Sequence, residues 1–247
     1  MEESKKTSAL ILNRQPYREY DSLVTVYTPD LGKLNLVARG TQKLQSKLAG
    51  HIEPLTLAEI MIITGRGFDY IGSAVSREVY AGIRQDLNKL YYAGQALKLF
   101  NRLVKEGEAE AGLFFLLADW LEVLNNFSDF NKEKGELFLG FFTWQFLAAL
   151  GYKPEMYKCL VKGEEIRPGQ SYFNLAKGGL VCQSCFEQER VAANLVSTEL
   201  LPISDNCVKI IRFILTGKFS QAEKIKIDKK LIRELIILAD GFVKFCF

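Results

Sequence analysis

The hydrophobic pattern of the chain changes its period once, and this change sets the fold class. Over residues 8–77, short apolar runs rich in β-branched residues alternate with polar positions, which is typical of half-buried strands. After Gly82, apolar residues recur every three to four positions, which is typical of amphipathic helices. The sequence therefore predicts an α+β protein, with a β domain over residues 1–81 and an α-helical domain over residues 82–247.

Five strands are expected in the β domain. They are predicted at residues 8–14, 21–28, 33–39, 55–64 and 68–76. Pro29 and Gly32 supply turn chemistry between the second and third strands, and Gly65 and Gly67 supply it between the last two. Five short strands with a longer connection after the third favour an OB-type β-barrel.

Three amphipathic helices are expected after the barrel. Their predicted buried faces contain Leu87, Leu90, Tyr91, Gly94, Leu97 and Val104, then Leu113, Leu116, Leu117, Trp120, Leu121 and Leu124, then Leu137, Phe138, Phe141, Gln145 and Ala148. Gly151 and Pro154 end the third helix. Further helices are predicted at residues 187–200, 204–216 and 228–245.

A cysteine knuckle is expected at residues 151–186, where glycines break the helical period around three cysteines, Cys159, Cys182 and Cys185. A structural zinc site takes four ligands, usually from two CxxC pairs. Here Lys162 stands where the first pair would have its second cysteine. We therefore expect no cofactor, and zinc on these three cysteines is the alternative.

Local charge is more informative than the net charge of +3. Residues 31–52 carry Lys33, Arg39, Lys43 and Lys47 and no acidic residue. On a barrel face, such cations would follow a phosphate backbone, and nearby aromatic rings would stack on bases. The candidate rings are Tyr17, Tyr20, Tyr27, Phe68 and Tyr70. The alternative is a solvated strand edge guarded by lysines, with the rings in the core.

A second basic segment lies near the C-terminal end. It contains Lys218, Lys224, Lys226, Lys229, Lys230 and Arg233, interleaved with Phe219, Ile225, Ile227 and Leu231. This mixture suits a groove for an acidic peptide with a hydrophobic end. The alternative is a helix with one solvated face.

Catalytic and membrane functions find little support in the sequence. There is a single histidine, and no GxSxG, Walker A or Rossmann pattern can be read. We therefore expect no enzyme. The N-terminal residues lack the apolar stretch of a signal peptide, and the apolar stretch at residues 137–150 is too short to span a bilayer. These features predict a cytoplasmic protein without a membrane partner.

An ordered set of short motifs resembles the RecO family of bacterial recombination mediators. The motifs are ALILNR at 9–14, YREYDS at 17–22, TPDLGK at 28–33, ARG at 38–40, SKL at 46–48, GYKP at 151–154 and GGLVCQSC at 178–185. The resemblance spans nearly the whole chain. It departs from the metal-binding members at Lys162, where those carry a cysteine.

This resemblance implies a nucleoid-associated DNA repair protein without a catalytic centre. Such a protein would bind single- and double-stranded DNA, anneal complementary strands and, with RecR, load recombinase on strands coated by single-strand-binding protein, whose C-terminal tail it would also bind. Family DNA contacts map to Lys33, Arg39, Lys43 and Lys47. Arg14 and Arg18 are further candidates beside acidic neighbours.

Two other functions fit the residues without the resemblance. An RNA-binding OB-fold protein would use the same barrel and basic segment. A protein adaptor that does not bind DNA would use only the helical domain. Relative affinity for single-stranded DNA and RNA separates the first, and DNA binding with a steep salt dependence excludes the second.

Overall fold

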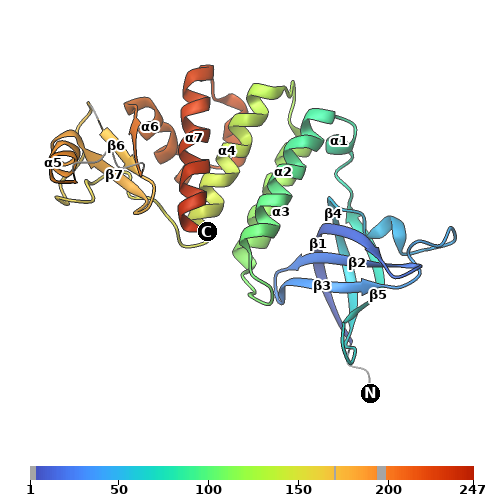
Figure 1. The fold of residues 1–247 in the computed structure, drawn as a ribbon. Coiled ribbons are helices and arrows are strands. Elements are labelled where there is room, and N and C mark those ends of the chain that lie inside the picture. The colour runs from blue at the N-terminus through green and yellow to red at the C-terminus, as the bar shows by residue number, and fades with distance from the viewer. Residues whose placement is uncertain (1–3, 170, 194–198) are drawn as a thin grey trace. The chain divides into compact units, whose positions relative to one another are not determined.

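The computed structural model describes residues 4–169, 171–193 and 199–247. The chain divides into two compact units, Met1–Phe127 and Ser128–Phe247 (Figure 1). The first unit contains all five strands expected in the β domain and the first three helices. The second unit contains the cysteine knuckle and the remaining helices. The chain changes from strand to helix near residue 81, as the sequence predicts. The division into compact units nevertheless places the first three helices with the strands.

The strands of the first unit form a closed barrel. They are β1 (Ser4–Tyr17), β2 (Asp21–Thr28), β3 (Gly32–Ala38), β4 (Thr56–Ile63) and β5 (Tyr70–Glu78), in the order β1-β2-β3-β5-β4. β4 also pairs with β1 and completes the ring. The closure between β3 and β5 is narrow, because these two strands pair in parallel through Val37 and Tyr70 alone. The predicted five-stranded OB-type fold is confirmed.

The barrel core follows from the two-residue alternation of the strands. Val24 and Val26 on β2 and Leu36 and Ala38 on β3 are buried in one apolar cluster. β1 reaches both of its neighbours because a bulge near Ile11 shifts its register along the strand. This bend allows a single long strand to pair with β2 at one end and with β4 at the other.

Three helices follow the barrel in the first unit: α1 (Ala81–Arg84), α2 (Leu87–Leu103) and α3 (Ala111–Asn126). The buried face predicted for α2 is largely wrong, because Leu87, Leu90 and Tyr91 are exposed. The physical reason is a long-range contact: Phe100 packs edge-on against the ring of Tyr27, with centroids 5.0 Å apart. The helix is turned so that the buried residues are Lys89, Tyr92, Ala93, Ala96, Leu97, Phe100 and Leu103.

The second unit is built around α4 (Lys132–Ala149), which is buried on nearly all sides, as expected for a core helix. It packs against α6 (Asp205–Thr216), the 3-10 helix η2 (Phe219–Lys224) and α7 (Lys229–Cys246). The side chain of Ser204 caps α6 and that of Asp228 caps α7. Both helices therefore begin where their capping residues predict.

The cysteine knuckle contains a small sheet that the sequence pattern does not reveal. Its strands are β6 (Ser171–Asn174), β7 (Gly179–Cys182) and β8 (Leu200–Ile203), in the order β7-β6-β8. Strands of four residues are too short for alternation to show. The helix predicted at 187–200 is corrected on both sides: α5 (Gln183–Ala193) begins earlier, and Leu200 starts a strand. Residues 194–198 of that prediction lie outside the described residues.

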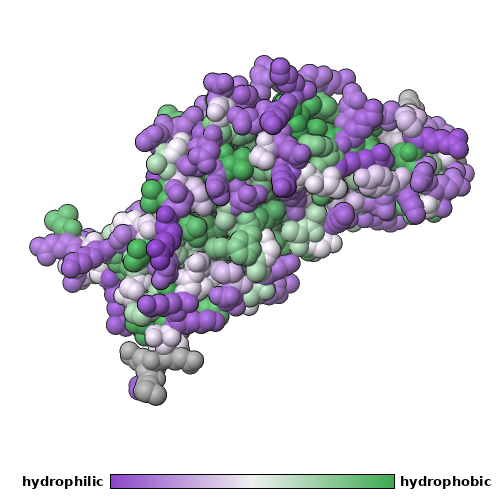
Figure 2. Space-filling model, turned by 180° about the vertical axis from the view of Figure 1, so that it is seen from behind, coloured by the Kyte–Doolittle hydropathy of each residue, from purple (hydrophilic) through white to green (hydrophobic). Residues whose placement is uncertain are grey.

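The face seen in Figure 2 mixes apolar side chains, in green, with polar side chains, in purple. None of the helices in residues 4–169, 171–193 and 199–247 combines the length and apolar character needed to cross a membrane.

Candidate nucleic-acid interface and cysteine cluster

The segment between β3 and β4 brings together three of the four basic residues predicted to contact nucleic acid. Arg39, Lys43 and Lys47 line one groove, and Tyr70 and Gly72 of β5 line it as well. All three cationic side chains are exposed. Within the described residues, no ion pair involves any of them. Their charges are therefore free to attract an anionic ligand.

Two of these cations lie over aromatic rings. The guanidinium carbon of Arg39 is 3.9 Å from the ring centroid of Tyr70, and the ammonium of Lys43 is 5.2 Å from that of Tyr20. These are cation–π distances, so the rings hold the cations at defined positions. The backbone N–H of Gln42 donates to the carbonyl of Tyr20 at 3.0 Å and joins the basic segment to the β1–β2 turn.

The β1–β2 turn adds a third pair of this kind. Arg18, which has a left-handed backbone with φ 54°, lies over the ring of Tyr17 at 5.1 Å. Tyr17 in turn contacts Phe68 edge-on, with centroids 6.0 Å apart. Tyr20 and Phe68 are 47% and 46% exposed, so both rings are accessible. A hydrogen bond to Glu19 raises the pKa of Tyr20 above its usual value.

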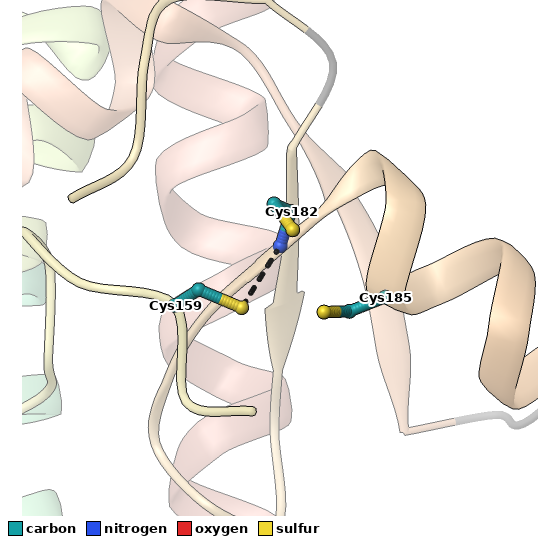
Figure 3. A group of neighbouring side chains, drawn as sticks. All are labelled: Cys159, Cys182 and Cys185. Atoms are coloured by element: carbon teal, nitrogen blue, oxygen red, sulfur yellow. Dashed lines mark hydrogen bonds between the residues drawn. The ribbon is translucent and has the colours of Figure 1, made fainter. Parts of the chain in front are cut away.

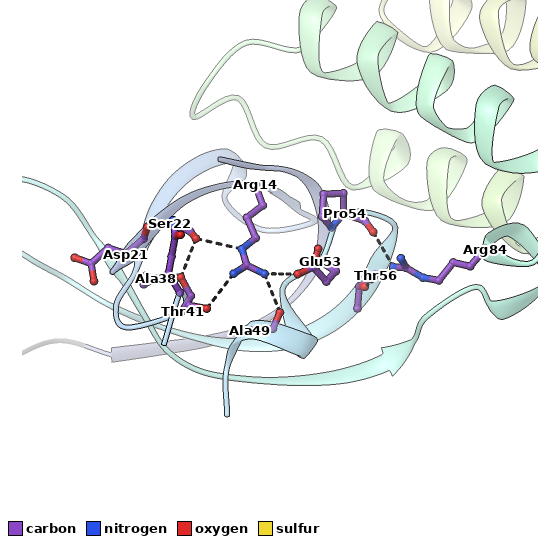
Figure 4. A network of polar contacts seen from close by, with 11 residues as sticks. Arg14, Asp21, Ser22, Ala38, Thr41, Ala49, Glu53, Pro54, Thr56 and Arg84 are labelled. Atoms are coloured by element: carbon purple, nitrogen blue, oxygen red, sulfur yellow. Dashed lines mark hydrogen bonds and ion pairs between the residues drawn. The ribbon is translucent and has the colours of Figure 1, made fainter. Parts of the chain in front are cut away.

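Arg14 lies among acceptors of the protein itself. Its guanidinium donates to Ser22 Oγ at 3.1 Å and to the carbonyl oxygens of Ala49 and Thr41 at 3.2 Å each, and it forms an ion pair with Glu53 (Figure 4). Its side chain is only 16% exposed. Arg14 therefore fastens the segment after β3 onto β1 and β2, and its donors already have partners.

Lys33 is separated from the groove by the length of β3. Its ammonium donates to the carbonyl of Asn101 in the last turn of α2 at 2.8 Å. The carbonyl of Lys33 accepts from the N–H of Gly107 at 3.0 Å. Lys33 thus joins the barrel to the end of α2. Tyr27 is also removed from the candidate interface, because its ring is fully buried.

The three cysteines of the knuckle converge from different segments (Figure 3). Cys159 lies in the loop after α4, Cys182 ends β7 and Cys185 lies on α5. Their Sγ atoms all lie within 4.8 Å of one another. The backbone N–H of Cys182 donates to Cys159 Sγ at 3.5 Å. The predicted grouping of these residues is confirmed.

Half-buried Cys182 and buried Cys185 differ in acidity. Burial raises the pKa of Cys182, but hydrogen bonds with Ser184, Cys185 and Cys159 outweigh it and lower the pKa to about 7. Burial raises the pKa of Cys185 to about 12, and hydrogen bonds with the other two cysteines add to this effect. Deprotonation therefore falls first on Cys182.

The donor set does not fit a closed zinc site. Such a site requires four ligands in a tetrahedron. The described residues supply three thiols, and Lys162 at the expected fourth position donates from Nζ to Ser184 Oγ at 3.0 Å. An ammonium has no lone pair to offer a metal.

The second unit also carries an apolar groove with a basic rim. Its floor includes Tyr172 and Leu201, and Ile237 on α7 lines it while being 60% exposed. Lys230 and Arg233 also line the groove, as does Glu234, whose carboxylate accepts from the N–H and the hydroxyl of Ser204. Two other residues of the predicted basic segment differ in position: Lys229 lines the groove but pairs with Glu133 at 2.8 Å, and Lys226 lines a separate small pocket.

Two family patterns together match nearly the whole chain. The family pattern described as Recombination protein O N terminal matches residues 1–80, and the one described as Recombination protein O C terminal matches residues 84–245. The chain belongs to the RecO family. RecO family membership gives it a role in DNA repair and recombination.

Curated RecO relatives extend over nearly the same length. The DNA repair protein RecO of Dehalococcoides mccartyi is 30% identical over 241 residues, which cover 97% of this chain and 89% of the relative. That of Desulforamulus reducens is 29% identical over 97% of this chain and 88% of its own. That of a Roseiflexus species is 31% identical over 90% of this chain and 74% of its own.

Proposed function

We propose that the chain is a recombination mediator that binds single- and double-stranded DNA through its barrel and anneals complementary strands. With RecR, it helps to load recombinase onto strands coated by single-strand-binding protein. The observation that carries this proposal is the groove in which Arg39, Lys43 and Lys47 lie beside accessible aromatic rings. The role requires binding and release of strands, and no bond-breaking centre.

The groove combines the two elements that recognise an unpaired strand. Cations follow the phosphates by releasing counterions, and this attraction does not depend on sequence. Exposed rings stack on bases, which are accessible in a single strand and hidden in a duplex. Tyr20, next to Lys43, and Phe68, next to Tyr17, provide such rings. A duplex would use the same cations without the rings, so single strands bind more tightly.

Annealing follows from the same charges. Two complementary strands repel each other through their phosphates, and this repulsion weakens when protein cations neutralise one backbone. Because no carboxylate in the described residues pairs with Arg39, Lys43 or Lys47, their charges act on the strand in full. A strand held in this way approaches its complement at lower electrostatic cost.

The apolar groove of the second unit suits the tail of single-strand-binding protein. Lys230 and Arg233 offer positive charge at the rim, and Tyr172, Leu201 and Ile237 offer apolar surface. An acidic peptide with a hydrophobic end would match both features. Binding of this tail would bring the barrel to strands that the partner already covers.

Strand annealing tests the proposal. Complementary strands coated with single-strand-binding protein should anneal faster with the full chain, and more slowly with the variant R39A/K43A/K47A. The same two proteins should be compared for binding to single-stranded DNA and RNA of equal sequence. Higher affinity for RNA and no annealing would favour the RNA-binding alternative. Absence of binding to either nucleic acid would favour the adaptor.

A further inference from the structure

Lys162 occupies the position at which a four-cysteine knuckle has the second cysteine of its first CxxC pair. We infer that this knuckle folds without a metal ion and that a hydrogen-bond chain from Lys162 through Ser184 to Cys182 holds together the segments that a metal would join. The inference concerns the architecture of the second unit and does not depend on the proposed DNA binding.

The chain of contacts joins separate parts of the knuckle. Lys162 Nζ donates to Ser184 Oγ at 3.0 Å, and Ser184 Oγ lies 3.3 Å from Cys182 Sγ. The N–H of Cys182 donates to Cys159 Sγ at 3.5 Å. The loop after α4, the end of β7 and the first turn of α5 are therefore connected through polar atoms of the protein.

The local backbone directs Lys162 toward this chain. The N–H of Gly163 donates to the carbonyl of Cys159 at 2.8 Å, and Gly163 has φ 71°, a left-handed conformation that suits glycine. The turn over residues 159–163 thus keeps the shape of a metal knuckle. Its fourth side chain reaches α5 and ends in an ammonium in place of a thiolate.

Packing supplies the stability that a metal provides in smaller knuckles. Cys159 and Cys185 are 2% and 1% exposed and share an apolar cluster with Val181 and Leu200. In such surroundings, cysteines behave as small hydrophobic residues. The rings of Tyr172 and Phe186 add a stacked pair, with centroids 3.6 Å apart. Zinc knuckles that need metal to fold lack a core of this kind.

Substitution of the ammonium offers a direct test. Lys162→Cys restores the two CxxC pairs and should create a four-thiolate site on a backbone that already has the right turn. The matched control is Val161→Cys, because Val161 is 50% exposed, and a thiol there adds a ligand with the wrong spacing. Both variants contain the same number of cysteines.

The full-length proteins should be reduced, stripped of metal and titrated with Co²⁺ alone and then with Zn²⁺ alone. We expect K162C to bind one Co²⁺ with the absorption of a tetrahedral thiolate site and to bind Zn²⁺ more than about 100-fold more tightly than the wild type, since a lost outer partner alone costs roughly 10–100-fold. The V161C variant should behave as the wild type. The inference would be overturned if the wild type bound Co²⁺ in a tetrahedral site with an affinity within tenfold of that of K162C. Equal Co²⁺ affinities of K162C and V161C would also overturn it.

Thermal unfolding gives a second readout that does not depend on an engineered site. A chelator should leave the melting temperature of the wild type unchanged. Lys162→Met keeps the apolar stem and removes the donor that links the loop to α5, so it should lower the melting temperature, and added Zn²⁺ should not restore it. A fall in the melting temperature of the wild type with chelator, or recovery of K162M with Zn²⁺, would show that a metal holds the knuckle.

Discussion

The guanidinium of Arg39 lies over the ring of Tyr70 at the point where β3 meets β5. Arg39 directly follows β3 and Tyr70 begins β5, so this pair spans the narrow closure of the barrel. The ring fixes one face of the guanidinium, and Lys43 and Lys47 line the same groove. The charge of the groove is therefore concentrated at one end of the barrel.

Removal of the three groove cations should reduce the electrostatic part of DNA binding. For the variant R39A/K43A/K47A, the slope of log affinity against log salt should fall by about 2, at about 0.7 per phosphate contact of a single strand. The loss should be similar for every sequence, because phosphate contacts carry no base information. Fluorescence polarisation over a series of salt concentrations measures both quantities.

The matched control is the variant K98A/R102A/K105A, which removes three exposed cations from α2 and the segment after it. Its slope should stay close to that of the wild type. Equal slopes for the two triple variants, with both folded by circular dichroism, would place the DNA site elsewhere.

The exposed rings should contribute affinity that salt does not affect. Phe68→Ala and Tyr20→Ala should each weaken binding to single strands by about 1–3 kcal/mol if each ring stacks on one base. Duplex binding should change less, because its bases are already stacked on each other. Tyr91→Ala is the control, since Tyr91 is 60% exposed on α2, outside the barrel. An equal loss for single strands and duplexes would argue against stacking.

Lys33 should affect stability more than DNA binding. Lys33→Met removes the hydrogen bond to the carbonyl of Asn101 and should lower the free energy of unfolding by about 1 kcal/mol. The salt slope of DNA binding should stay unchanged. Urea unfolding tests the stability and the polarisation series tests the salt slope. A lower salt slope of DNA binding would indicate that Lys33 contacts DNA.

Arg14 should act on DNA binding through the segment that it holds. Arg14→Ala removes hydrogen bonds to Thr41 and Ala49 and should destabilise the fold by about 2 kcal/mol. Arg14→Lys should recover little, because one ammonium cannot match the spread donors of a guanidinium. Amide exchange should rise in residues 39–53 in both variants. Lower DNA affinity with unchanged exchange there would indicate that Arg14 touches the strand itself.

The groove on the second unit should select an acidic tail. In the full-length chain, K230A/R233A should weaken binding of a synthetic tail of single-strand-binding protein by roughly fivefold, since two exposed ion pairs at about 0.5 kcal/mol each amount to about 1 kcal/mol. K209A/K226A is the control, because both lysines line a different pocket. Ile237→Asp should weaken binding further by placing a negative charge in the apolar groove. Full binding by I237D would assign the tail to another surface.

Local patterns predict the five barrel strands, the end of α4 and both ends of α6 and α7. Turn residues such as Gly32 and caps such as Ser204 and Asp228 act within a few positions of the chain, and the structure confirms them. The basic segment after β3 can also be predicted, because the absence of acidic residues there is visible in the sequence.

Contacts between distant residues account for what the sequence does not predict. The orientation of α2 depends on Phe100 meeting Tyr27, which no local period encodes. The same helix determines the role of Lys33, whose acceptor lies at Asn101. From the sequence, Arg14 is a candidate DNA contact. The structure shows that its guanidinium already donates to Thr41 and to other acceptors of the protein. Charge patterns identify cations, and only the fold shows which of them already have partners.

The single pair between Val37 and Tyr70 has a thermodynamic consequence for any strand that binds beside it. Residues that directly follow β3 and residues of β5 both line the groove, so a bound ligand would contact both strands of a closure that few backbone hydrogen bonds secure. A ligand that prefers the closed form stabilises it in proportion to the logarithm of its concentration. Binding in the groove and closure of the barrel are thus linked. We expect local opening between β3 and β5 to be least frequent when DNA is bound.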